Sequence, residues 1–202
     1  MKKLIEIKKK LASDWFRSLQ NKIINQFQLL EDEVGKENKT KTKKFVKREW
    51  AKKNKSEGGG TSYLLSGGEL FDKVGVNQST VTGQFEKSFR SKILGAEKNG
   101  KYWASGISIV AHMKNPKIPA FHFNTRFIVT SQEWFGGGMD VTPSFKDAKE
   151  KLIIHQKLKK ICLSNHKDYN KYKKWCDNYF YLPHRKETRG IGGIFFDYET
   201  KN

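Results

Sequence analysis

AFHFNTRFI, residues 120–128, alternates between two kinds of side chain and so predicts a β-strand. One face of this strand carries small or apolar side chains, which we expect to pack against a core: Phe121, Phe123, Thr125 and Phe127. The other face carries His122, Asn124 and Arg126 in a row about 13 Å long. A face that is simply wetted by solvent is the alternative. We expect such a face to be lysine-rich in this chain, so the composition favours a functional role.

The segments on either side predict strands first and helices afterwards. We expect strands at 61–65, 70–76, 102–112 and 190–198, helices at 1–34, 146–164 and 169–182, and a glycine-rich loop at 134–143. Strands in consecutive runs favour an α+β fold with an antiparallel sheet over a doubly wound parallel fold.

The strands on either side of the loop 114–119 are expected to form a hairpin. Two prolines in this loop exclude it from a ladder of strand hydrogen bonds. Ser108 and His112 share one face of the first strand. If the loop closes symmetrically around Lys117, His112 pairs with His122 and Ser108 pairs with Arg126.

Length and composition predict one soluble domain. The chain has 202 residues, two cysteines (Cys162 and Cys176) and no apolar run near the ~20 residues that span a bilayer. Two cysteines without zinc-ribbon spacing predict buried, reduced thiols and a cytoplasmic location. The start MKKLIEIKKKLA lacks the apolar segment of a secretory signal.

The net charge of +19 leaves three interpretations open. Lysine-rich, solvated helix surfaces are the plainest, attraction of an acidic small molecule is the second, and polynucleotide binding is the third. The sequence contains no RNP, zinc-finger or helix-turn-helix signature, so we expect no nucleic-acid partner.

WFGGGMD, residues 134–140, has an unusual composition for a surface turn. Three glycines permit close approach of the backbone to a ligand, and Asp140 follows them directly. The segment is not a Walker loop, because no Gly-Lys-Ser/Thr follows. A bare surface turn is the alternative, and the two preceding aromatic residues make it less attractive.

The histidines give a weak metal signal. His155 is predicted to point inward from its helix, where a histidine is more often a satisfied core residue than a ligand. His184 follows the end of the next helix, and His166 is expected at the surface. Imidazole suits several transition metals, but no local ligand spacing of a known metal motif is present.

Four long segments, in order, resemble oxygen-dependent coproporphyrinogen III oxidases. They are GGGTSYLL with FDKVGVNQSTVTG, ASGISIVAHMKNPKIPAFHFNTRF, EWFGGGMDVTP, and YKKWCDNYFYLPHRKETRGIGGIFFDY. The resemblance implies a homodimer whose subunits contain a large, flat antiparallel sheet flanked by helices on both faces. It also implies conversion of two propionates of coproporphyrinogen III to vinyl groups, with O₂ consumed and CO₂ and hydrogen peroxide released, to give protoporphyrinogen IX for haem synthesis.

Site residues follow from the matched motifs. Ser108 resembles the substrate-contacting serine of the family, and His122 resembles its proton donor. Asn124, Thr125 and Arg126 match its substrate-binding tripeptide. Asp140 resembles the carboxylate that holds the pyrrole N–H groups, and Arg126 would stabilise developing negative charge beside it.

The resemblance also implies a set of metal ligands, and we expect no organic cofactor. His112, His122, His155 and His184 match four histidines assigned to a divalent metal, such as Mn²⁺, in bacterial members. O₂ is the expected co-substrate, and the electron-rich reduced pyrrole needs no organic cofactor.

Members of this family continue beyond the motif GIGGIFFD, whereas this sequence ends at Asn202. We therefore expect one domain over 1–202, with a helical region at 1–57, a sheet and active-site region at 58–202, and the C-terminal segment of the family absent. An inactive truncated fragment and a basic nucleic-acid-binding module are the alternatives to an active oxidase.

Overall fold

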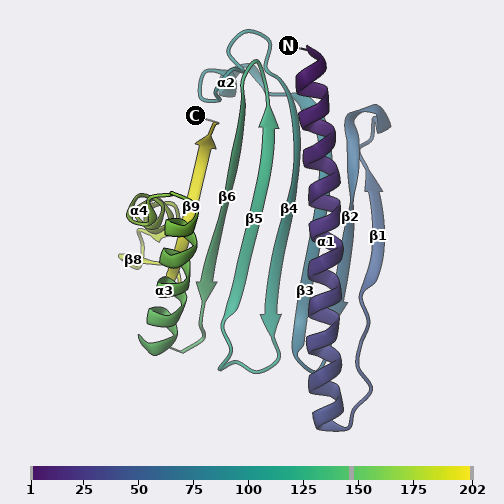
Figure 1. Cartoon of the computed structure of the whole chain (residues 1–202), viewed down its shortest axis with the longest axis vertical. Helices are drawn as coiled ribbons and strands as arrows, with labels where there is room; N and C mark the ends of the chain where they lie inside the picture. The colour runs from purple at the N-terminus through teal and green to yellow at the C-terminus, as the bar shows by residue number, and fades with distance from the viewer. Residues whose placement is uncertain (1, 146–147, 201–202) are drawn as a thin grey trace.

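The computed structural model describes residues 2–145 and 148–200, which form a seven-stranded antiparallel sheet with four α-helices (Figure 1). The strand order is β1-β2-β3-β4-β5-β6-β9, so neighbours in the sheet are mostly neighbours in the sequence. The α+β class is thereby confirmed. The elements are α1 (Lys2–Asn38), β1 (Val46–Ala51), η1 (Lys55–Glu57), β2 (Gly58–Ser66), β3 (Phe71–Gln84), α2 (Lys87–Arg90), β4 (Lys101–Met113), β5 (Ala120–Val129), β6 (Glu133–Thr142), α3 (Ala148–Ser164), α4 (Tyr169–Tyr179), β7 (Tyr181–Leu182), β8 (Glu187–Thr188) and β9 (Gly192–Glu199).

Helix α1 covers one face of the sheet (Figure 1). Phe16 and Ile24 of the helix are buried in one cluster with the apolar side chains of β3, β4 and β5, among them Val76, Ile109 and Phe127. The alternation predicted for residues 120–128 therefore has its expected cause, because Phe121, Phe123 and Phe127 belong to this core. The opposite face of β5 is left for polar side chains.

Helices α3 and α4 pack against the sheet at its β9 edge (Figure 1). Phe195 and Phe196 are adjacent in β9 and point to opposite faces. The ring of Tyr172 in α4 lies 5.5 Å from that of Phe196, and the ring of Tyr179 stacks 4.4 Å from that of Phe195. Helix α4 thus bridges both faces at this edge. Among the described residues, no helix has the length and apolar character needed to cross a membrane.

Two predicted boundaries were wrong. The first helix runs to Asn38, but residues 46–51 of the expected helical region 1–57 form β1, which pairs with β2. The partners of β1 are in the glycine run that begins β2, where Gly59 pairs with Ala51 and Gly60 pairs with Trp50. Residues 181–182 leave the predicted helix 169–182 and pair with β8. In each case cross-strand pairing overrides local propensity. Positions 146 and 147 of the predicted helix 146–164 lie outside the described residues.

The glycine-rich segment forms strand β6 and not a loop. It pairs with β5 on one side and with β9 on the other. Glycine is a poor strand former, but Gly136, Gly137 and Gly138 are all buried here, where neighbouring strands leave no room for a Cβ. The three glycines, which predicted a loop, instead allow β6 to pack closely against its neighbours.

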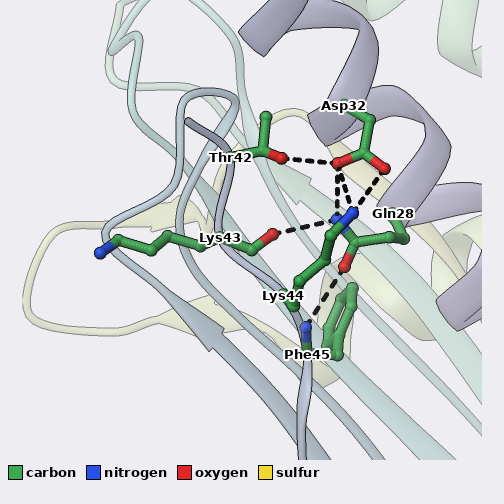
Figure 2. Close-up of polar contacts among 6 residues, drawn as sticks. All are labelled: Gln28, Asp32, Thr42, Lys43, Lys44 and Phe45. Atoms are coloured by element: carbon green, nitrogen blue, oxygen red, sulfur yellow. Dashed lines mark hydrogen bonds and ion pairs between the residues drawn. The ribbon is translucent and has the colours of Figure 1, made fainter. Parts of the chain in front are cut away.

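The connection between α1 and β1 is held by the carboxylate of Asp32 (Figure 2). Its Oδ1 accepts hydrogen bonds from Thr42 Oγ1 (2.7 Å), Lys44 Nζ (2.9 Å) and Gln28 Nε2 (3.0 Å). Gln28 also bonds the backbone, because its Nε2 donates to the Lys43 carbonyl and its Oε1 accepts from the Phe45 N–H. These bonds order the polar break after α1 and set the start of the edge strand.

Protonation of Asp32 is expected to weaken this connection. Hydrogen bonds from Lys44 and Thr42 lower the pKa of Asp32 from 3.8 to about 2. Since the folded-state pKa lies below the unfolded one, the ionised group stabilises the fold above pH 4, and this contribution is lost as the pH falls towards 2. The difference in free energy of unfolding between wild type and Asp32→Asn should therefore shrink from pH 5 to pH 2.

Lys44→Met is the matched variant, since it removes the first-named cause of the shift and leaves the carboxylate in place. Its difference from wild type should shrink over the same pH range. If the free energy of unfolding changes with pH in the same way for wild type and Asp32→Asn, the folded-state contacts of Asp32 do not lower its pKa.

Candidate functional site

The face of the sheet opposite α1 has a floor of glycine and serine. The ladder partners of β2 to β6 bring many glycines and serines to this face. We call the following residues on it the floor: Gly60, Ser62, Gly75, Ser79, Gly106, Ser108, Gly136 and Gly138. Because these residues carry little or no side chain, the floor is shallow and presents backbone to anything that lies on it. A flat ligand of considerable width could rest there.

Polar side chains stand in register on this floor. Asn77, Ser108 and Asn124 are successive cross-strand partners on β3, β4 and β5. Together with Arg126 and Trp50 they line a cavity of about 290 Å³. The predicted substrate-contacting residues Ser108, Asn124 and Arg126 therefore meet in one cavity.

Arg126 is held by two acceptors. Its Nη1 donates to Asn124 Oδ1 at 3.1 Å, and its Nη2 donates to Asp197 Oδ2 at 2.7 Å. The other oxygen of Asp197 accepts the indole N–H of Trp134 at 2.9 Å. Sequence reasoning missed Asp197, although an aspartate that ends the apolar run GIFF is a signal of a satisfied partner.

His122 and Asp140 are cross-strand partners on β5 and β6. Nδ1 of His122 is buried, has no hydrogen-bond partner among the described residues, and lies 3.6 Å from Oδ2 of Asp140. Asp140 is 1% exposed, and its Oδ2 accepts from Arg189 Nη2 at 2.8 Å and Nε at 3.2 Å. A small rotation of the imidazole would complete a His–Asp hydrogen bond through Nδ1. Nε2 would then be available for proton transfer to or from a ligand.

Cys176 is buried near Asp140, and its thiol is expected to be unreactive. Burial, reinforced by the negative charge of Asp140, raises the pKa of its thiol to about 12. The thiol is therefore neutral at physiological pH and is no nucleophile. Both cysteines are free and buried, as predicted.

The hairpin register differs from the prediction by two residues. His122 pairs with Val110, Asn124 with Ser108, and Arg126 with Gly106. The loop therefore closes around position 116 and not around Lys117. A shift of two keeps every side chain on its predicted face, which is why the polar face survives the error.

Thr125 points away from the polar face. The strand alternation places its side chain on the face of α1, where it lines a cavity of about 430 Å³ with Phe135, Ile161 and Tyr172. Any contact of Thr125 with a ligand on the floor would come from its backbone.

The four histidines of the predicted metal set lie in three places. The rings of His112 and His122 are 6.1 Å apart on the polar face, whereas His184 is exposed in the turn between β7 and β8. His155 is 2.7 Å from the carbonyl of Ile191 through Nε2 and 2.8 Å from the Tyr169 hydroxyl through Nδ1.

Both ring nitrogens of His155 are therefore occupied. Because a carbonyl only accepts, Nε2 must carry the proton, and Nδ1 then accepts from the tyrosine. Over residues 2–145 and 148–200, no three histidine, cysteine or acidic side chains are grouped to hold a metal ion. The four histidines of the predicted metal set therefore do not fit one metal ion within a single chain, over the residues that the structure describes.

A family model and the curated relatives both match this chain to the same family. The family model described as coproporphyrinogen III oxidase matches residues 11–202. The chain is 48% identical over 191 residues to the oxygen-dependent coproporphyrinogen-III oxidase of Rickettsia bellii (strain OSU 85-389), 49% identical to that of Rickettsia akari (strain Hartford), and 47% identical to that of Rickettsia rickettsii (strain Sheila Smith). Each match covers 94% of this chain and 67% of the relative. The chain belongs to the coproporphyrinogen III oxidase family.

Proposed function

We propose that this chain carries out the oxygen-dependent oxidative decarboxylation of two propionates of coproporphyrinogen III, giving protoporphyrinogen IX. One observation carries the proposal: a cationic, hydrogen-bonding cavity on a glycine floor stands beside a His–Asp pair, in a chain 47–49% identical to enzymes of that name. The names of the relatives favour this function over the nucleic-acid-binding alternative.

Substrate binding follows from charge and shape. The substrate has four carboxylates, which suit a chain of net charge +19 and a guanidinium at the cavity wall. The floor accommodates a wide tetrapyrrole because glycine and serine leave its surface low. Ser108, Asn77 and Asn124 supply hydrogen-bonding groups in the cavity that Trp50 and Arg126 also line.

The chemistry at each propionate is a balanced two-electron oxidation. A C–H bond at the carbon next to the pyrrole and the C–C bond to the carboxylate break, and a C=C bond forms. The carboxylate leaves as CO₂, and O₂ takes up two electrons and two protons to become hydrogen peroxide. One proton comes from the broken C–H bond and one from the medium. His122 would deliver or accept protons at the ring, and Arg126 would hold the carboxylate that leaves.

We assign Asp140 to orienting His122. Direct contact with a pyrrole N–H, which the resemblance implies, is disfavoured by its 1% exposure and by its ion pair with Arg189. As a buried anion opposite Nδ1, it would instead fix the imidazole tautomer and stabilise the protonated ring.

Homodimeric assembly and a cytoplasmic location are part of the same proposal. Leu4, Ile7, Leu11 and Trp15 of α1 are exposed apolar side chains, as expected of a surface that another protein segment covers. A divalent metal such as Mn²⁺ stays a prediction from the resemblance. Sedimentation of the purified protein tests the homodimer, and metal analysis of the same protein tests the metal.

The test of function is an aerobic assay. Purified protein incubated with coproporphyrinogen III should form protoporphyrinogen IX, detected by fluorescence after oxidation, only when O₂ is present. Arg126→Ala serves as the control for non-enzymatic oxidation. Binding of coproporphyrin III without turnover would support the inactive-fragment alternative. Salt-sensitive DNA binding without porphyrin binding would support the basic module.

A further inference from the structure

The guanidinium of Arg126 and the carboxylate of Asp197 lie directly on the backbone of β6. A Cβ built on Gly136 would stand 2.3 Å from Asp197 Oδ1 and 3.0 Å from Arg126 Nη2. No side chain can occupy that space while the pair is present, so the middle strand must be glycine there. The residues come from β5, β6 and β9 and are far apart in the sequence.

The carboxylate is itself fixed on its other side. Oδ1 of Asp197 accepts from the indole of Trp134 at 2.9 Å and from the Tyr198 N–H at 3.1 Å. Trp134 is 3% exposed, and the ring of Tyr198 lies 5.4 Å from its ring. Because these bonds fix the carboxylate of Asp197, the guanidinium of Arg126 can pair with it in only one position.

Arg126 keeps donors for a ligand. A guanidinium has five N–H groups. Within the described part of the chain, its hydrogen bonds engage Nη1 once and Nη2 once, while the side chain lines the 290 Å³ cavity. Arginine loses much rotamer freedom on binding, and prior fixation removes that cost from the binding step.

We propose that Asp197 is a positioning residue that clamps Arg126 on Gly136, so that its remaining N–H groups face the cavity and receive a substrate carboxylate. The inference rests on the proposed function and adds a residue that acts on substrate only through Arg126. It also explains why a glycine stands at position 136, between an arginine and an aspartate that must meet over it.

A double-mutant cycle tests the clamp. The dissociation constant of coproporphyrin III, which has four carboxylates and does not react, is measured by fluorescence for wild type, Asp197→Asn, Arg126→Ala and the double variant. Asp197→Asn should weaken binding about tenfold, the scale of one lost charge-assisted hydrogen bond. In the Arg126→Ala background the same change should have almost no effect, because the residue through which it acts is gone.

The preference for a ligand with more carboxylates is a second measurement. A purely structural role of Asp197 would leave this preference unchanged. Wild type should prefer coproporphyrin III to mesoporphyrin IX, which has two carboxylates, and Asp197→Asn should narrow this preference. Gly136→Ala displaces the same pair without altering charge and should reproduce the effect. Glu199→Gln, which removes the ion pair with Lys167 elsewhere on β9, is the control and should keep the preference.

The outcomes separate the two proposals. Equal losses from Asp197→Asn in both backgrounds, or an unchanged preference, would overturn the clamp while the function stands. A wild-type protein that binds no porphyrin would overturn the function and the clamp together. Thermal unfolding of each variant shows whether the loss accompanies general destabilisation, and Gly136→Ala supplies the second test if Asp197→Asn does not fold.

Discussion

His122→Gln is expected to lower kcat for coproporphyrinogen III by about 10²–10⁴, the usual contribution of a positioned proton-transfer group. Glutamine keeps hydrogen-bonding capacity at the floor but cannot carry a proton on and off at neutral pH. KM should change much less, because Arg126, Asn124 and Ser108 line the cavity independently of the imidazole. Steady-state formation of protoporphyrinogen IX under air is the measurement.

His166→Asn is the matched control. His166 is an exposed histidine in a turn with φ of +54°, a conformation that asparagine tolerates well. Its kcat should equal that of wild type. If His122→Gln retains wild-type kcat, the imidazole has no part in proton transfer.

Asp140→Asn separates orientation from direct chemistry. An amide at this position cannot neutralise a protonated His122 or Arg189, so kcat should fall with little change in the binding of coproporphyrin III. Unchanged turnover would remove Asp140 from the mechanism. Because the change leaves Arg189 without its anion, thermal unfolding must accompany the kinetics.

The alternation of β5 was predictable because it is a local property with a period of two. It fixed the polar and apolar faces, and both survived a register error of two residues. The identity of β6 was not predictable from its own residues, since glycine is depleted in strands. Its burial between β5 and β9 comes from pairing with a segment over 50 residues later.

The polar partners of the site were missed for the same reason. Asp197 is 71 residues from Arg126, and Arg189 is 49 residues from Asp140. Sequence spacing carries no information about contacts between segments that are separated by two helices. The resemblance named Asp140, but only the fold shows that it pairs with His122 across β5 and β6 and is buried in an ion pair with Arg189.

Glu31→Ala is expected to destabilise the fold by about 3 kcal/mol or more. Glu31 is 0% exposed, and its carboxylate accepts the backbone N–H groups of Glu69 (2.6 Å), Leu70 (2.9 Å) and Phe71 (3.2 Å). The contact ties α1 to the turn that joins β2 and β3. Removal of the carboxylate leaves three N–H donors without their acceptor next to the buried ring of Phe71.

The neighbouring glycine offers an independent route to the same loss. A Cβ on Gly68 would lie 2.5 Å from Glu31 Oε1, so Gly68→Ala must push the carboxylate off its donors. Since about 1 kcal/mol corresponds to 2–4 °C in a domain of this size, Glu31→Ala should lower Tm by about 6–12 °C. Glu33→Gln, an exposed carboxylate on the same helix, should stay within about 0.5 kcal/mol of wild type. Equal Tm values for Glu31→Ala and Glu33→Gln would mean that the turn is held by its own backbone bonds, from Gly67 N–H to the Asp72 carbonyl and from Gly68 N–H to the Phe71 carbonyl, and not by the helix.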